Sequence, residues 1–335
     1  MLGKAISRAL WILTLAGSFL LLLAGLSYFW LFWSLLDLLS IFVPVLWAFC
    51  GVAGLYWLFA DWKRSLVPIL TLLLSFIWFP TYLRIGPADF IEADGASFRI
   101  ASYNSGNLDS ASSPWRKLKN DLQQVTDSLQ ADIICFQELK RDITKRLNGY
   151  PYRYFSPVEP GKSDQAIFSN YPIVGSGTVN FSDSANNAIY ADIVIQGDTI
   201  RVYNVHLQSY RIHSGRYLMR DFGKPMLRRI SDVAGRHMEQ AALVKSHQEA
   251  AGLRSIICGD FNATAFSHAY QILNRGMQDT FAEKGSGLGA TFFRKRVPFR
   301  IDYILTDPTM EVLKHQVYAL RLSDHFPVTA TLRLH

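Results

Sequence analysis

The sequence predicts a layered α/β sandwich that is preceded by a group of hydrophobic helices. Two observations support this prediction. Almost no charged residue occurs before residue 84, and beyond it short apolar runs typical of strands alternate with a few longer amphipathic runs. With 335 residues, the chain is long enough for two folding units. We predict a hydrophobic anchor over 1–84, a linker over 85–97 and a globular domain over 98–335.

Three runs at the start of the chain contain no charged side chain, namely 9–36, 38–60 and 65–83. Each is long enough to cross a hydrocarbon core of roughly 30 Å, which requires about 20 residues. A cleaved signal peptide has a shorter apolar region, and here two more runs follow the first. We therefore predict three transmembrane helices and an integral membrane protein, with a buried helical hairpin as the alternative.

The basic residues near these runs predict the orientation. Lys4 and Arg8 precede the first run, Lys63 and Arg64 lie between the second and the third, and the first connection carries only Asp37. Positive residues favour the cytoplasmic side. Three crossings then place the globular domain outside the cytoplasm, whereas the orientation reverses if the tight turn near Asp37 is absent and the first two runs form one element.

Charge and cysteine content exclude several classes of protein. The formal net charge is +7, and the 30 basic and 25 acidic residues beyond residue 83 still give +5. A mildly basic domain fits an anionic substrate or membrane surface, or only a solvated surface. Cys50, Cys135 and Cys258 form no CxxC motif and no regular spacing, so neither a disulfide framework nor a cysteine zinc site is expected.

The predicted strands and helices follow in order beyond residue 97. A strand over 98–103 leads to a helix over 115–130, where leucine and valine recur on one face. Residues 196–198, Gln-Gly-Asp, separate two apolar runs and indicate a hairpin. A second long helix is predicted over 230–251. Further strands are predicted at 132–136, 166–169, 188–195, 199–207, 255–258, 302–305 and 327–334.

Polar residues recur where these apolar runs begin or end. Such a residue is most often a turn or cap residue when taken alone. Six strand ends with the same feature point to a common cause, because strand ends in a sandwich converge on one rim. The residues concerned are Asn104, Gln137, Glu138, Asn204, His206, Asp260, Asn262, Asp302, Ser323, Asp324 and His325.

These residue types form a chemically consistent set. Glu138, Asp324 and Asn104 offer hard oxygen ligands, which suit Mg²⁺ better than zinc. His325 is a plausible base or phosphate partner, and the carboxylate of Asp302 is suited to orient its ring. The alternative for Asp302 is a strand cap paired with a nearby arginine. Asn262 and His206 are suited to donate hydrogen bonds to phosphate oxygens.

Seven motifs carry a resemblance to a known family. The chain resembles the endonuclease/exonuclease/phosphatase superfamily, also called DNase-I-like, in motif order and spacing over about 98–335. GDFN and SDH together are the most specific of the motifs. The motifs are SYNSGN at 102–107, CFQE at 135–138, AIFSNYPI at 166–173, NVHL at 204–207, GDFN at 259–262, RIDYIL at 300–305 and SDHFPV at 323–328.

The resemblance implies a four-layer α/β sandwich, with two packed β-sheets flanked by helices, and phosphoester hydrolysis that depends on Mg²⁺ or Mn²⁺. By motif, it implies Glu138 and Asn104 as metal ligands with Asp324 close to the same metal. It further implies a catalytic set of His325, Asp302, Asp260, Asn262 and His206. The number of metals and the division of roles between His325 and Asp260 stay open. Gly106 replaces an acidic residue of some DNA-repair members, which weakens an abasic-site activity.

The substrate is left open by the motifs. Basic residues are frequent in 210–235 and in 294–300, and we list Asn204, Arg211 and Arg300 as predicted substrate contacts. A phospholipid head group at a bilayer is the first candidate, and nucleic acid outside the cytoplasm is the second. A non-enzymatic binding domain is the third. No obligate protein partner is predicted.

Overall fold

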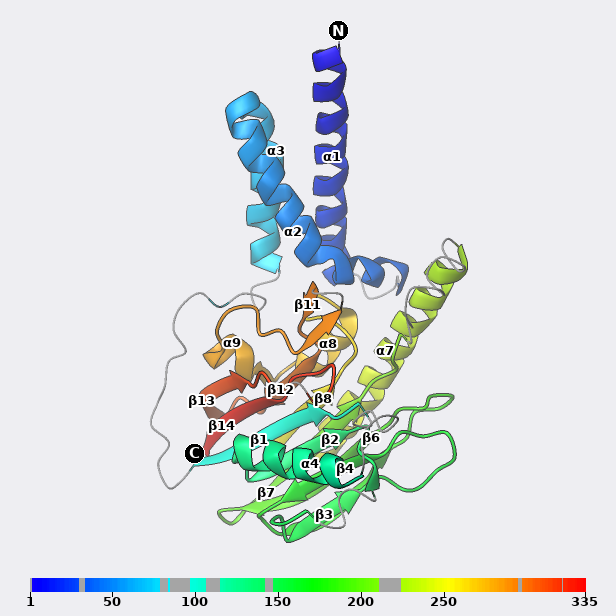
Figure 1. Ribbon diagram of the computed structural model, residues 1–335, viewed down its shortest axis with the longest axis vertical. Helices are drawn as coiled ribbons and strands as arrows, with labels where there is room; N and C mark the ends of the chain where they lie inside the picture. Colours follow the sequence, from blue (N-terminus) through cyan, green and yellow to red (C-terminus); the bar gives the residue numbers. More distant parts are fainter. Residues whose placement is uncertain are drawn as a thin grey trace. The chain divides into compact units, whose positions relative to one another are not determined.

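The computed structural model describes residues 2–29, 34–78, 84, 97–106, 115–141, 147–210, 224–294, 297–320 and 322–335 (Figure 1). Its contacts divide the chain into two compact units. The first holds the N-terminal helices, the start of α7 up to Arg236 and the segment Ala263–His268. The second holds both β-sheets and all but one of the predicted site residues; Arg211 lies outside the described residues.

The first unit contains helices α1 (Leu2–Phe29), α2 (Ser34–Ala60) and α3 (Trp62–Trp78). Two of them contain segments that are long and apolar enough to cross a membrane, Gly3–Leu26 and Leu39–Ala60. The third has only 17 residues, which at 1.5 Å per residue is short for a span. The described residues thus provide two candidate spans where the sequence predicted three.

The prediction of a tight connection at Asp37 is wrong. Asp37 is buried and lies in the first helical turn of α2. Its carboxylate accepts a hydrogen bond of 2.8 Å from the backbone N–H of His268, which belongs to the same unit. An acidic residue in the first turn also interacts favourably with the helix dipole. Asp37 therefore belongs to a helix and not to a connection.

Two mixed β-sheets of six strands each form the second unit, as the sequence predicted for a sandwich. The first sheet has the order β13 (Met310–Val317), β14 (Val328–Leu334), β1 (Ser97–Asn104), β2 (Ile133–Gln137), β4 (Gln165–Ser169) and β3 (Tyr152–Phe155). The second has the order β5 (Ile173–Val179), β6 (Ala188–Ile195), β7 (Asp198–His206), β8 (Ser255–Asp260), β12 (Asp302–Thr306) and β9 (Gln278–Asp279). A separate hairpin pairs β10 (Phe292–Arg294) with β11 (Val297–Phe299).

Helices flank the two sheets (Figure 1). Leu122 and Val125 of α4 (Trp115–Leu129) pack with Phe136 and Phe168 of the first sheet. The part of α7 (Lys224–Ala251) that belongs to the second unit contacts the second sheet, where His247 Nδ1 lies 2.8 Å from the hydroxyl of Tyr203. The short helices α8 (His268–Asn274) and α9 (Thr280–Lys284) complete the described helices.

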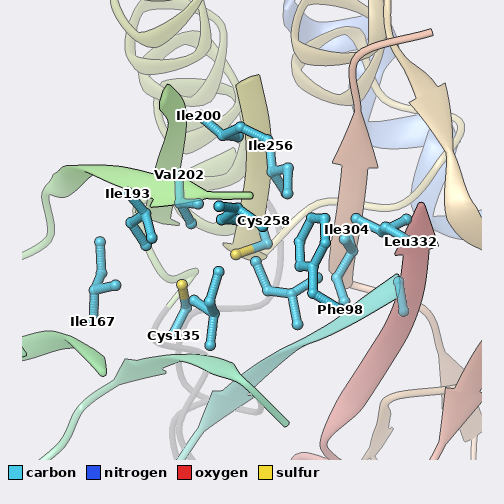
Figure 2. Packing of buried hydrophobic residues seen from close by; sticks show 14 of the residues in the cluster. Phe98, Cys135, Ile167, Ile193, Ile200, Val202, Ile256, Cys258, Ile304 and Leu332 are labelled. Carbon is cyan, nitrogen blue, oxygen red and sulfur yellow. The ribbon is translucent and has the colours of Figure 1, made fainter. Parts of the chain in front are cut away.

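The central strands are buried on both faces, and their side chains alternate between two cores. Phe98 and Ile100 of β1 point into the core between the sheets, whereas Ala101 and Tyr103 point towards α4. Figure 2 shows the inter-sheet core, to which the two sheets contribute mainly isoleucine and valine side chains. A strand buried on both faces reads as a continuous apolar run, as these strands do.

The strand register brings the polar strand ends together. β1 and β2 run parallel with Asn104 opposite Gln137, so both strands end at the same edge. β7 and β8 also run parallel, with His206 opposite Asp260, and the antiparallel strand β12 places Asp302 opposite Asp260 as well. The pairing of the strands alone therefore brings these polar residues to neighbouring positions at the strand ends.

Candidate active site

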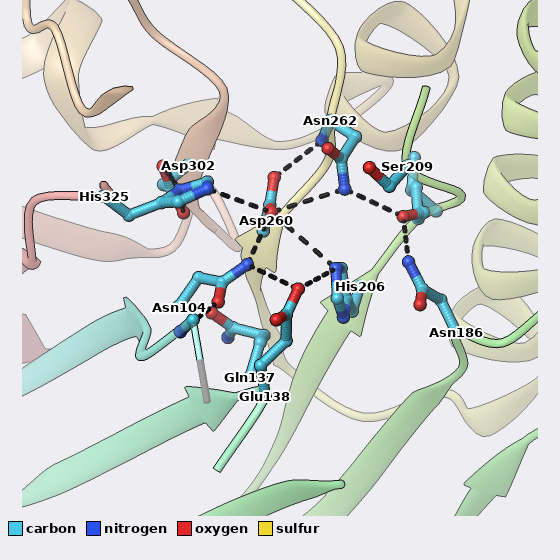
Figure 3. A network of polar contacts seen from close by, with 12 residues as sticks. Asn104, Gln137, Glu138, Asn186, His206, Ser209, Asp260, Asn262, Asp302 and His325 are labelled. Atoms are coloured by element: carbon cyan, nitrogen blue, oxygen red, sulfur yellow. Dashed lines mark hydrogen bonds and ion pairs between the residues drawn. The ribbon is translucent and has the colours of Figure 1, made fainter. Parts of the chain in front are cut away.

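Asn104 and Glu138 form the part of the site that belongs to the first sheet. The Asn104 side-chain amide donates to Asp260 Oδ2 at 2.9 Å and lies 3.5 Å from Glu138 Oε1. Glu138 has a φ of 54°, a backbone region that non-glycine residues rarely adopt. This conformation follows directly after β2. Figure 3 shows the Glu138 carboxylate directed towards Asn104 and His206.

His206 and Asp260 lie side by side on the second sheet. The His206 Nε2 atom is 3.7 Å from both Glu138 Oε1 and Asp260 Oδ2, which is too long for a hydrogen bond. Among the described residues, neither ring nitrogen of His206 has a hydrogen-bond partner, although the side chain is only 2% exposed. Buried polar atoms without a partner are rare and often belong to functional sites.

Asp302 and His325 form a directly bonded pair. His325 Nδ1 lies 2.9 Å from Asp302 Oδ2 and 3.2 Å from Oδ1, and both side chains are buried. The other ring nitrogen, Nε2, points towards Asp260 Oδ2 at 3.7 Å (Figure 3). A carboxylate that binds one imidazole nitrogen fixes the tautomer and the orientation of the ring. The geometry agrees with the predicted pair.

Burial and neighbouring charges act differently on the ionisable groups. Burial lowers the pKa of His325, but the carboxylates of Asp302 and Asp260 outweigh it and raise the pKa to about 10. Burial lowers the pKa of His206 to about 4, although Asp260 opposes this effect. Burial also raises the pKa of Asp260, against the effect of His325. At neutral pH, His325 therefore carries a charge and His206 does not.

Asn262 adopts an unusual backbone conformation beside Asp260. Its φ is 49°, and its backbone N–H donates to Asp260 Oδ1 at 2.8 Å. Its side-chain amide donates to the carbonyl of Leu207 at 3.0 Å. Asn186 donates to the same carbonyl at 2.7 Å. Strained residues held by several bonds are common at functional sites.

Asp324 lies at the rim of the site and is exposed. A Cβ atom on Gly106, which has a φ of +56°, would lie 3.5 Å from Asp324 Oδ1. The motif residue is thus next to the loop that follows Asn104.

Asn204 is not placed for substrate contact, and this prediction is corrected. Its side chain is fully buried between the sheets, where Oδ1 accepts from Gln137 at 2.7 Å. Its amide group donates to the carbonyls of Phe136 and Ala166 at 2.8 and 3.1 Å. These bonds use the polar atoms of Asn204 to connect the sheets.

The predicted substrate contact of Arg300 is also corrected, because its side chain is buried. The guanidinium group lies 2.6 Å from the carboxylate of Asp279, and both side chains are at most 2% exposed. The rings of Phe281 and Tyr303 lie 4.5 and 4.7 Å from it. Arg300 is therefore an ion-pair residue of the interior. Asp302 bonds to His325, whereas the described ion pair of Arg300 is with Asp279.

One residue near the site, Asn186, was not predicted from the sequence, and Gln137 was predicted only as a strand-end residue without a role. Gln137 and Asn186 both bond to neighbouring segments that carry site residues. For Gln137, the available signal is its position between Phe136 and Glu138. Asn186 lies in the loop before β6, where no apolar run marks it.

Oxygen and nitrogen donors suited to a divalent cation converge here. Asp260, Asp302 and His325 place one ligand atom each within 4.8 Å of one another. In this triad, however, Nδ1 of His325 is already bonded to Asp302. Asn104 and Glu138 offer a second donor set, and the carboxylate of Glu138 is 29% exposed. Both sets consist mainly of hard oxygen donors, which fit Mg²⁺ or Mn²⁺.

The site thus combines packed mixed sheets with a buried aspartate–histidine pair. Comparison with known proteins gives the class of the protein. A family model described as the endonuclease/exonuclease/phosphatase family matches residues 101–325. The chain belongs to this family, whose members are divalent-metal-dependent phosphoester hydrolases. The chain is thus an enzyme, and the non-enzymatic alternative is set aside.

Solved structures show the same fold. A humanized D. rerio TDP2 has 17% sequence identity and a TM-score of 0.56, covering 71% of this chain and 100% of that one. A family protein from Bacteroides thetaiotaomicron has 21% identity and a TM-score of 0.53, with 71% and 95% covered. A truncated Caenorhabditis elegans TDP2 has 17% identity and a TM-score of 0.54, with 72% and 100% covered. No curated protein matches the sequence.

Proposed function

We propose that the protein is a membrane-anchored, Mg²⁺-dependent phosphoester hydrolase, and that a phospholipid head group is its substrate. The observation that carries the reaction class at this site is the bonded Asp302–His325 pair beside Asp260. The anchor rests on α1 and α2, which are long and apolar enough to span a bilayer.

We assign the roles from charge and geometry. His325 is charged at neutral pH, so its free Nε2–H is suited to bind a phosphate oxygen and to stabilise the charge that develops there. Asp260 lies next to it and has a raised pKa, which makes it the better proton acceptor for the attacking water. His206 is neutral and completes the phosphate site together with Asn262.

Asn104 and Glu138 would hold the cation, with Asp324 at the rim. When bound, the cation would supply Lewis-acid polarisation of a phosphoryl oxygen. We favour this donor set over the triad of Asp260, Asp302 and His325, because a cation in the triad would have to break the bond between Asp302 and His325. Mg²⁺ is the expected ion, and Mn²⁺ is the expected substitute.

The proposal of a lipid substrate rests on the apolar helices and on the positive net charge of the chain beyond residue 83, which is +5. An enzyme held at a bilayer meets lipid head groups at high local concentration. Nucleic acid is the second candidate, because D. rerio TDP2, of the same fold, is known in complex with a single-strand DNA product. Both candidate substrates contain phosphodiester bonds. One assay that offers both to the same enzyme therefore shows which of them it cleaves.

The test uses the full-length chain in detergent or in vesicles, with Mg²⁺, against a phospholipid panel, plasmid DNA and single-stranded DNA. We expect release of a head group from at least one phospholipid and no cleavage of either DNA. The inactive control is the variant His325→Gln, which lacks the charged imidazole. DNA cleavage that His325→Gln abolishes, without lipid turnover, would refute the lipid proposal and support the nucleic acid.

A further inference from the structure

Thr291 is a buried residue that precedes β10 and contacts both segments that carry the aspartate–histidine pair. Its side-chain oxygen accepts hydrogen bonds from the backbone N–H groups of Ile301 at 3.2 Å and Asp302 at 3.1 Å. A hydroxyl oxygen has two lone pairs, so it can accept both bonds. The start of β12, where Asp302 lies, is thus held by the Thr291 side chain.

The backbone of the same residue holds the other segment. The carbonyl of Thr291 accepts a hydrogen bond of 2.6 Å from the N–H of Phe326, which directly follows His325. The next residue, Phe292, forms an isolated β-bridge with His325, and the two rings lie 4.9 Å apart. Thr291 and Phe292 therefore contact both the strand of Asp302 and the loop of His325.

We propose that Thr291 is a positioning residue, which sets the separation of Asp302 and His325 by bonding one segment through its hydroxyl and the other through its carbonyl. The inference rests on the proposed function of that pair. Asp302 and His325 come from different elements, and the described bonds of Thr291 connect those elements directly. A shift of about 1 Å in a catalytic group can cost about 10²-fold in rate.

The substitution Thr291→Val keeps the shape of the side chain and removes the acceptor, whereas Thr291→Ser keeps the acceptor. With bis(4-nitrophenyl) phosphate as the probe, we expect kcat of Thr291→Val to fall about ten- to a hundred-fold, with KM within about two-fold. We expect Thr291→Ser to stay within about two-fold of the wild type in both constants.

Thr306 supplies the matched control. It is fully buried at the other end of β12, and its hydroxyl has no hydrogen-bond partner among the described residues. Thr306→Val should leave kcat unchanged. If Thr291→Val does not fold, Thr291→Cys replaces it, because a thiol is a weaker acceptor of similar size. Equal kcat values for the serine and cysteine variants would then overturn the proposal.

A double-mutant cycle separates positioning from a general structural effect. If Thr291 acts through Asp302, adding Thr291→Val to Asp302→Asn should lower kcat by less than about two-fold more. If the kcat of the double variant is lowered by the product of the two single losses, the inference is overturned. A kcat of Thr291→Val within two-fold of the wild type would also overturn it.

A spectroscopic measurement keeps this inference separate from the proposed function. In the full chain, the low-field proton signal of His325 Nδ1–H should be present in the wild type and in Thr291→Ser, and shifted or lost in Thr291→Val. Absence of hydrolysis in the wild type would refute the proposed function alone. An unchanged signal in Thr291→Val would refute the positioning role alone.

Discussion

At the residue scale, contact with a carboxylate distinguishes the charge states of two buried histidines in one site. His206 and His325 are both nearly inaccessible, yet only His325 has a carboxylate in hydrogen-bond contact. The pKa of His206 is lowered to about 4 by burial, and that of His325 is raised to about 10 because the neighbouring aspartates outweigh burial. A single site thereby offers a neutral and a charged imidazole to one phosphate group.

The first prediction concerns the pair itself. Asp302→Asn should lower kcat by about 10²–10⁴-fold with little change in KM, because the ring of His325 loses the partner that orients and charges it. The measurement combines steady-state kinetics with the melting temperature of the full chain. A near-normal kcat together with a lowered melting temperature would mean that Asp302 is only structural.

The second prediction concerns the metal. EDTA should abolish hydrolysis, and Mg²⁺ or Mn²⁺ should restore it. Because a ligand that binds the folded state stabilises it, Mg²⁺ should also raise the melting temperature of the wild type. Glu138→Gln should weaken this thermal shift, whereas Glu239→Gln, at an exposed position on α7, should not. Full activity in EDTA would contradict the metal requirement.

The third prediction concerns acid stability. Burial lowers the pKa of His206, His237 and His315 to about 4. Between pH 6.5 and 4 the unfolded chain binds protons that the folded chain does not, so stability is lost as the pH falls through this window. Each of these histidines lowers the free energy of unfolding by about 1.4 kcal/mol for each pH unit of acidification in this window. The pKa of His325 is raised, so its stabilisation of the fold is fully present below about pH 6.5. That stabilisation is lost as the pH rises from there towards 10.

The histidine at position 315 allows a direct test. His315→Gln should reduce the loss of unfolding free energy between pH 6.5 and 5 by about 2 kcal/mol relative to the wild type. Denaturant unfolding at the two pH values measures this difference. His335→Gln, at an exposed residue, is the control and should keep the wild-type slope. Equal slopes in all three proteins would show that His315 does not titrate on unfolding.

At the element scale, the pairing of β7 with β8 depends on a single glycine. Gly259 has a φ of +139°, and a Cβ atom there would lie 1.9 Å from the carbonyl oxygen of Val205. Gly259 is opposite Val205 in the parallel register and directly precedes Asp260. Any side chain would therefore separate the two strands next to the site.

The fourth prediction follows from this contact. Gly259→Ala should lower the free energy of unfolding by about 3 kcal/mol, from backbone strain and overpacking together, and should displace Asp260. Gly235→Ala in α7 is the matched control, since its Cβ would meet no atom within 4 Å. Alanine in a helix should be neutral or stabilising there by about 0.5–1 kcal/mol. Equal effects in the two variants would contradict the close approach at Gly259.

Sequence patterns predicted strands with a clear apolar run, whether buried on both faces, as β2 is, or alternating, as β6 is. β2 and β8 are short apolar runs, β1 is an apolar run interrupted by Arg99, and the polar residue at the end of each was visible. β3 and β5 were not predicted, because both contain exposed or half-buried positions that break the pattern. Predicted roles failed at Asn204 and Arg300 for a related reason. Their partners lie far away in the sequence, as Gln137 does for Asn204, so spacing carried no signal.

At the scale of the whole molecule, the number of membrane crossings determines the side of catalysis. The described helices offer two candidate spans, Gly3–Leu26 and Leu39–Ala60. The sequence prediction of three crossings adds the uncharged run 65–83, of which the structure describes only the part within α3. Three crossings place the catalytic unit outside the cytoplasm, and two place it inside.

The fifth prediction addresses this choice. The full chain should stay in the membrane fraction after an alkaline wash, because α1 and α2 are long and apolar enough to span a bilayer. We expect a reporter fused after His335 to give an extracytoplasmic signal, with the same reporter fused after Ala60 as a control for the number of crossings. A cytoplasmic signal from His335 would establish an even number of crossings. Release into the soluble fraction would refute the anchor.

The pairing of β1 with β14 has a consequence for the time course of synthesis. Ser102 lies opposite Val328 in the antiparallel register, 226 residues later in the chain. At roughly 5–20 residues per second, a ribosome needs on the order of 10–50 seconds to make the intervening chain. Pairing over such a separation also folds slowly. For that interval the apolar β1 lacks a neighbour on one edge, so nascent chains are expected to depend on chaperones to avoid aggregation.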